Sequence, residues 1–129
     1  MTKGEFRCCF FARDYEAALD FYRDGLGLPV IESWNRGPDD RGTLFSAGSG
    51  MIEVLALPRH PEQDSVSDYQ SPRGVMIAIE ADDVDAWYRR AVEKGLPIRE
   101  ELINQDWGHR SFRLTDPDGV ALYLFSKLD

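Results

Sequence analysis

The side chains that could carry out chemistry are few and widely spaced. The sequence holds two histidines, His60 and His109, and two cysteines, Cys8 and Cys9. A disulfide between adjacent cysteines requires strained geometry, so both are predicted to be reduced and buried. His60 lies in a proline-rich stretch and is expected in a solvated loop. His109 precedes a predicted strand and is expected to point to solvent, or to touch a ligand at a rim near Trp107. No Ser-His-Asp triad can be assembled from this spacing.

Glu53 is the acidic residue with the clearest chemical role. It lies in a short apolar segment that is typical of a strand, and alternation along a strand places Met51, Glu53 and Leu55 on one face. A charged carboxylate buried there without a partner would destabilise the fold, or the group would be protonated. We therefore expect a cationic or hydrogen-bonding ligand, or Arg110, to satisfy it. Glu53 is also the candidate general base if the protein is an enzyme.

The first half of the chain predicts a strand, a helix and three strands. Residues 6–11 form a short apolar run, Asp14 is a good N-cap, and apolar residues then recur every three or four positions. Gly25 and Gly27 end that helix. Three strands are predicted at residues 30–34, 43–47 and 51–57, separated by turns at 37–42 and 48–50.

The second half repeats this order after a proline-rich stretch, 58–73, that reads as a linker. A strand at 74–80 precedes a helix that Asp82 and Asp83 can cap, and strands follow at 98–103, 110–115 and 120–125. The tripeptide Gly-Leu-Pro at 27–29 recurs at 95–97, and the same offset of 68 positions relates Asp14 to Asp82. The sequence therefore indicates an internal duplication.

The predicted fold class is α+β, with two βαβββ modules that form a curved mixed sheet, a cup, with helices on the outside. The chain is expected to be a single domain over residues 1–129, with module 1 at about 5–57 and module 2 at about 74–126. The inner face of the cup would be apolar, aromatic and sulfur-bearing, with one or two carboxylates. The residues predicted to line this site or its rim are Cys8, Phe10, Trp34, Glu53, Met76, Trp107, Arg110, Phe112 and Tyr123.

Composition limits the partners that such a site could serve. The chain of 129 residues carries 23 acidic and 15 basic side chains, for a formal charge of -8. This charge repels a phosphate backbone and an anionic membrane, so neither nucleic acid nor a membrane is expected as a partner. The N-terminus lacks the apolar core of a signal peptide, and a cytoplasmic location is expected.

Two sets of motifs resemble the vicinal oxygen chelate superfamily, which includes glyoxalases, bleomycin resistance proteins and dioxygenases. The early set is Asp14, Ala18, Phe21-Tyr22 and Leu26-Gly27. The late set is Trp107-Gly108-His109-Arg110-Ser111-Phe112 and Asp116-Pro117-Asp118-Gly119, which looks like the bleomycin-resistance branch. The resemblance covers residues 6–126 and implies the cup-shaped fold and a homodimer, whereas the superfamily carries many chemistries on this fold.

The resemblance also identifies the positions at which metal-dependent members hold a divalent ion. They fall on Cys8, Glu53, Met76 and Tyr123, where Cys8 and Met76 are 68 positions apart and Glu53 and Tyr123 are 70 apart. A catalytic ion needs about three or more N, O or S ligands. Because Glu53 alone is a ready ligand for a hard or borderline ion, no metal and no other cofactor are expected.

The favoured functional hypothesis is a metal-independent small-molecule binding protein, with drug sequestration as one role. Its ligand would be a small apolar, aromatic or cationic molecule, held by aromatic stacking and a buried carboxylate. The alternative is a lyase, isomerase or dioxygenase of the same fold that uses Glu53 as general base or atypical metal ligand. A third alternative is an accessory module whose cup is filled by its own side chains.

Overall fold

The computed structural model describes residues 2–57 and 71–129, and the chain divides into two compact units, Met1–Gln70 and Ser71–Asp129. Module 1 lies in the first unit and module 2 in the second, and each is described by itself. His60 and most of the expected linker lie outside the described residues. That the chain forms a single domain stays a prediction.

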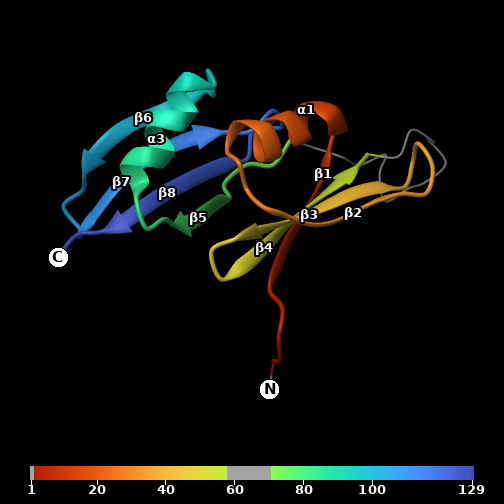
Figure 1. Ribbon diagram of the computed structural model, residues 1–129, viewed down its shortest axis with the longest axis horizontal. Coiled ribbons are helices and arrows are strands. Elements are labelled where there is room, and N and C mark those ends of the chain that lie inside the picture. Colours follow the sequence, from red (N-terminus) through yellow and green to blue (C-terminus); the bar gives the residue numbers. More distant parts are fainter. Residues whose placement is uncertain (1, 58–70) are drawn as a thin grey trace. The chain divides into compact units, whose positions relative to one another are not determined.

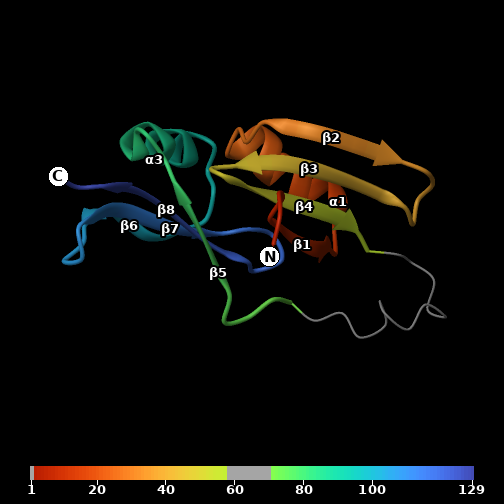
Figure 2. The same ribbon diagram turned by 90° about the horizontal axis from the view of Figure 1, so that it is seen from below.

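Module 1 contains a mixed sheet of four strands in the order β1-β4-β3-β2 (Figure 1). Its elements are β1 (Arg7–Ala12), α1 (Tyr15–Leu19), the π-helix η1 (Asp20–Gly25), β2 (Val30–Asn35), β3 (Arg41–Ala47) and β4 (Gly50–Ala56). β1 is parallel to β4, and the other neighbours are antiparallel. Figure 2 shows β2, β3 and β4 side by side with alternating directions.

Aromatic side chains attach the helical segment of module 1 to one face of its sheet. Tyr22 of η1 is fully buried, and its ring centroid lies 5.8 Å from those of Phe10 on β1 and Phe45 on β3. The hydroxyl of Tyr15 on α1 forms a hydrogen bond of 2.6 Å with that of Thr43. We call the face that these helices cover the helix face and the opposite one the distal face.

Module 2 repeats the arrangement with the strand order β5-β8-β7-β6. Its elements are β5 (Met76–Glu80), α3 (Val84–Glu93), β6 (Ile98–Asn104), β7 (His109–Thr115) and β8 (Ala121–Lys127). β5 is parallel to β8, and β7 is antiparallel to both β8 and β6. Tyr88 of α3 packs edge-on against Phe112 of β7, with 5.1 Å between ring centroids, which defines the helix face of this sheet.

The predicted α+β class and the two βαβββ modules are confirmed. The largest differences lie at strand ends: β5 begins at Met76 rather than at 74, and β8 continues to Lys127. His109 is the first residue of β7 instead of preceding it. Among the described residues, no helix is long and apolar enough to cross a membrane.

The helix caps correct the predicted offset between the modules. Asp14 caps α1 by accepting a hydrogen bond of 3.1 Å from the backbone N–H of Ala17. The equivalent cap of α3 is Asp83, which accepts a hydrogen bond of 3.2 Å from Ala86. The predicted equivalent was Asp82, 68 positions after Asp14, whereas the structural offset at the caps is 69 positions.

The π-helix in module 1 accounts for the difference of one residue. The N–H of Leu28 donates to the carbonyl of Tyr22, six residues earlier, whereas the equivalent N–H of Leu96 donates to Ala91, five residues earlier. Module 1 therefore has one more residue between its helix cap and its Gly-Leu-Pro tripeptide. A π-helical turn contains more residues than an α-helical turn, so η1 accommodates the extra residue without displacing either end.

Candidate functional site

Glu53 lies on the distal face of module 1 and is held in an ion pair. Its carboxylate accepts a hydrogen bond of 2.6 Å from Nη1 of Arg7, and the Glu53 side chain is only 14% exposed. The same guanidinium binds the exposed Glu5 at 2.7 Å. Hydrogen bonds to the two carboxylates raise the pKa of Arg7 above its usual value. Glu53 therefore has a cationic partner from its own module, and Arg110, which was expected to pair with it, forms an ion pair with Asp85 of module 2.

The strand register corrects the predicted position of Cys8 and Phe10. β1 pairs with β4 so that Cys8 lies opposite Ile52 and Cys9 lies opposite Glu53. Paired residues of neighbouring strands point to the same face. Cys8 and Phe10 therefore lie on the helix face, and their predicted shared face with Glu53 is wrong. A shift of one residue along a strand reverses every side chain.

Cys9 is the cysteine that accompanies Glu53. It is exposed, whereas Cys8 is half-buried. Desolvation raises the pKa of the Cys9 thiol, and the negative charge of Glu53 raises it further. Burial alone raises the pKa of Cys8. Both thiols are free, but Cys9 does not match the prediction of buried cysteines.

Trp34 lies on the distal face of module 1, as the alternation along β2 requires. It pairs with Gly42, which in turn pairs with Leu55 on the same face as Glu53. A Cβ atom on Gly42 would come within 3 Å of the Trp34 ring, so the indole lies directly over this glycine. The guanidinium of Arg36 lies 5.9 Å from the indole centroid. The absence of a side chain at 42 thus makes room for Trp34.

An aromatic cluster centred on Tyr123 occupies the distal face of module 2. The Tyr123 hydroxyl accepts a hydrogen bond of 3.0 Å from Nε1 of Trp107 and lies 2.9 Å from Nδ1 of His109. The His109 ring stacks on Phe125, with 4.2 Å between centroids and an interplanar angle of 17°. Tyr123 is 9% exposed and Trp107 is 63% exposed. We call these four residues the aromatic cluster.

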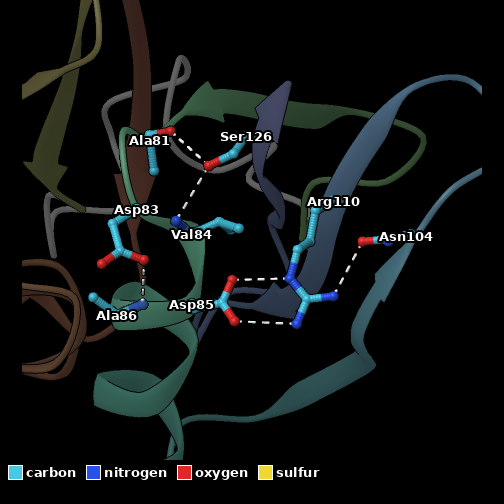
Figure 3. A network of polar contacts seen from close by, with 8 residues as sticks. All are labelled: Ala81, Asp83, Val84, Asp85, Ala86, Asn104, Arg110 and Ser126. Atoms are coloured by element: carbon cyan, nitrogen blue, oxygen red, sulfur yellow. Dashed lines mark hydrogen bonds and ion pairs between the residues drawn. The ribbon is translucent and has the colours of Figure 1, made fainter. Parts of the chain in front are cut away.

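Arg110 and Phe112 are on the helix face of the same sheet, so they do not share a face with Tyr123, with which they were predicted to line one site. Arg110 makes two hydrogen bonds, of 2.9 and 3.1 Å, to Asp85 at the start of α3 and a third, of 3.1 Å, to Asn104 (Figure 3). Phe112 is 1% exposed and packs against Tyr88. Both residues join α3 to the sheet, because residues 110 and 112 alternate with the distal residues His109 and Ser111.

The four positions that the resemblance assigns to a metal do not fit one. In module 1, Cys8 lies on the opposite face from Glu53, whose carboxylate pairs with Arg7. In module 2, Met76 shares a face with Tyr123, but neither is a favoured ligand of a catalytic divalent ion. Among residues 2–57 and 71–129, no three His, Cys, Asp or Glu side chains come together as a metal site would require.

Two hollows in module 1 lie beside α1 rather than on the distal face. One has a volume of about 280 Å³ and is lined by residues 12–16, Arg41, Ala56 and Leu57. The second, of about 320 Å³, lies beside β2 and shares Tyr15, Glu16 and Arg41 with the first. Glu16 binds Arg41 at 3.0 Å, and the Arg41 guanidinium stacks over Tyr15 at 4.8 Å. Of the predicted site residues, only Trp34 borders either hollow.

Comparison with known families agrees with this architecture. The family model described as Glyoxalase/Bleomycin resistance protein/Dioxygenase superfamily matches residues 6–124. The chain belongs to this superfamily. The resemblance seen in the sequence motifs is thereby confirmed, and the family includes proteins of several activities on one fold.

Individual relatives of the superfamily cover nearly the whole chain. YraH of Bacillus subtilis (strain 168), an uncharacterized protein, is 25% identical over 89% of this chain and 91% of its own length. A protein of unknown function from Agrobacterium tumefaciens str. C58 is 27% identical, with a TM-score of 0.75 over 99% of this chain and 98% of that one. TnmS3, an antibiotic binding protein from Streptomyces sp. CB03234, is 22% identical, with a TM-score of 0.70 over 98% and 97% of the two chains.

Sequence reasoning missed Arg7 and Cys9 and underrated His109. Residues 8–11 are apolar at consecutive positions, so alternation within this run does not reveal which residues share a face with Glu53. The signal for His109 was present, because Tyr123 and Phe125 were predicted to share a face. The pairing of His109 with Lys127 places its side chain on that face too.

Proposed function

We propose that this protein binds a small planar aromatic molecule and acts by affinity, without a metal ion, as a sequestering protein would. The observation that carries the proposal is the aromatic cluster of Trp107, Tyr123, His109 and Phe125 on the distal face of module 2. Its outermost member, Trp107, is 63% exposed although its indole N–H already has a hydrogen-bond partner.

Two properties of the cluster, its exposed indole and the fixed position of that ring, support a role in binding. A large exposed indole contributes apolar area and a π face to a ligand, at a low cost in conformational entropy. Its hydrogen bond to Tyr123 fixes the ring before a ligand arrives, which reduces the entropy lost on binding. Met76, which is 48% exposed on the same distal face, adds a flexible apolar contact.

Module 1 offers a second set of distal-face residues with a different character. Trp34 supplies another indole, and Glu53 supplies a carboxylate that Arg7 partly neutralises. We propose that Glu53 orients a ligand that carries a hydrogen-bond donor or a positive charge, which would compete with Arg7 for the carboxylate. The antibiotic-binding description of TnmS3, which shares the fold, supports a ligand of antibiotic-like chemistry.

Tryptophan fluorescence tests this proposal. Protein treated with EDTA is titrated with a panel of aromatic and cationic antibiotics, and saturable quenching with at least one compound is expected. Trp107→Leu should weaken that binding by about tenfold or more, because the stacking partner is lost. Trp87→Leu on α3 is the matched control and should bind as the wild type does. Binding that requires added metal, or no binding up to millimolar concentrations, would contradict the proposal.

The second candidate function is an enzyme of the same fold that uses Glu53 as general base. It is favoured by the burial of Glu53, which is 14% exposed and fixed by Arg7 at 2.6 Å. Glu53→Gln separates the two functions: an enzyme would lose turnover while keeping its fold, whereas a binding protein would keep most of its affinity for an uncharged aromatic ligand.

We further propose a homodimer in the cytoplasm, and light scattering on purified protein measures the oligomeric state.

A further inference from the structure

The aromatic cluster contains a chain of hydrogen bonds whose direction can be worked out. The indole N–H of Trp107 has no lone pair to offer, so it can only donate to the Tyr123 oxygen, 3.0 Å away. The Tyr123 hydroxyl has one hydrogen of its own. Within the described parts of the chain, its hydrogen-bond partners are Trp107 and Nδ1 of His109 at 2.9 Å.

The state of His109 follows from the need to satisfy that hydroxyl hydrogen. If Nδ1 carried a proton and donated, the Tyr123 oxygen would accept two hydrogen bonds and its own hydrogen would have no acceptor. Tyr123 is only 9% exposed, so this arrangement would leave a donor unsatisfied in a mostly buried place. The favourable arrangement is therefore a relay in which Trp107 donates to Tyr123 and Tyr123 donates to Nδ1.

A neutral imidazole whose Nδ1 accepts carries its proton on Nε2. His109 is half-buried, and its ring plane is fixed by stacking on Phe125 at 4.2 Å. Among the described residues, the imidazole makes its hydrogen bond through Nδ1. Nε2 has no partner there, and it is not one of the buried side-chain atoms that lack a hydrogen bond. The Nε2–H group is thus a donor without a partner among the described residues, and it belongs to the same cluster as the exposed indole of Trp107.

We propose that the Trp107–Tyr123 relay fixes His109 as a hydrogen-bond donor through Nε2, and that this donor selects aromatic ligands bearing an acceptor, such as a ring nitrogen or a carbonyl oxygen. This inference rests on the proposed binding function and specifies the ligand class. Tyr123 is a positioning residue in this scheme, because it acts on the ligand through His109.

A matched pair of probes, quinoline and naphthalene, tests the inference. They have the same shape and differ by one ring nitrogen that accepts a hydrogen bond. NMR titrations of ¹⁵N-labelled full-length protein at pH 8.5 give both affinities, and long-range ¹H–¹⁵N spectra give the His109 tautomer. We expect the Nε2–H tautomer and a preference of about 3- to 10-fold for quinoline, the value of one neutral hydrogen bond.

Three variants distinguish the relay from general structural effects. Tyr123→Phe removes the hydroxyl that joins His109 to Trp107, so it should produce a mixture of tautomers and lower the preference for quinoline over naphthalene in proportion to the Nε2–H form that is lost. His109→Phe should abolish the preference and keep an aromatic ring over Phe125. Tyr88→Phe removes a hydroxyl on the helix face of the same module and should retain both the tautomer and the preference.

Each outcome bears on the inference in a defined way. Equal affinity of the wild type for the two probes, a protonated Nδ1 in the neutral ring, or a preference that persists in both Tyr123→Phe and His109→Phe would overturn the relay while leaving the proposed binding function intact. Failure of both probes to bind would contradict the binding function at this cluster, and the inference would fail with it.

Discussion

Replacement of Phe112 tests whether the two faces of module 2 have been assigned correctly. The sequence placed Phe112 and Trp107 at the same ligand site, whereas the structure places Phe112 in the core at 1% exposure and leaves Trp107 63% exposed. Loss of Phe112 should therefore reduce stability, and loss of Trp107 should reduce ligand binding.

The size of the effect follows from burial and packing. Truncation of a fully buried phenylalanine to alanine removes its transfer free energy and leaves a cavity, which together cost about 3–5 kcal/mol. The edge-on contact with Tyr88 at 5.1 Å is part of that loss. Because domains are stable by about 5–15 kcal/mol, Phe112→Leu is the safer variant. Because this substitution changes the side chain less, it should lower the free energy of unfolding by about 1–1.5 kcal/mol and Tm by about 3–5 °C.

Guanidinium denaturation followed by circular dichroism at 25 °C measures this cost. Trp107→Leu is the matched control, because its side chain is mostly exposed and it loses a single hydrogen bond, for an expected cost below about 1 kcal/mol. The reasoning would be refuted if Phe112→Leu were as stable as the wild type while Trp107→Leu lost more than about 2 kcal/mol, since the two faces would then be exchanged.

Two further predictions concern the strand register and the contact between α3 and the sheet. Iodoacetamide at pH 8 should label Cys9 before Cys8, as measured by peptide mass spectrometry, and Glu53→Gln should accelerate the labelling of Cys9 by removing the charge that raises its pKa. Earlier labelling of Cys8 would contradict the assigned register. The hydrogen bonds from Arg110 lower the pKa of Asp85, so its ionised form stabilises the fold above the carboxyl's usual pKa, and this contribution is lost as the pH falls through the lowered value. Asp85→Asn should therefore lower Tm at pH 7, with a difference from the wild type that shrinks below about pH 4, and a difference independent of pH would argue against the ion pair.

Much of the fold could be predicted because each βαβββ module leaves local signals in the sequence. Helix caps such as Asp14, the positive-φ residues Gly27 and Gly95, and short apolar runs mark the elements in chain order. The face sets centred on Glu53 and Tyr123 also followed from alternation and are confirmed by strand pairing. These features depend on residues close in sequence.

The errors arose where a small shift in register has a large spatial effect. Module 1 has one extra residue in its helical segment, which η1 accommodates. Equivalent residues of the two modules are therefore 69 positions apart before that segment and 68 positions apart after it. Since strand side chains alternate, this single residue moves Cys8 and Phe10 to the helix face. Arg110 and Phe112 were predicted as rim or wall residues without use of the alternation that sends them toward α3.

Mapping the bound ligand by NMR tests the central claim most directly. A ¹⁵N-labelled protein is titrated with the tightest aromatic compound from the fluorescence panel, and the indole N–H signals of Trp107 and Trp87 are followed together. The account predicts a saturable shift of the Trp107 signal and of His109, with the Trp87 signal on α3 unchanged. Shifts confined to Trp87, or to the hollow beside Tyr15 and Arg41, would show that the ligand binds elsewhere and would contradict the account.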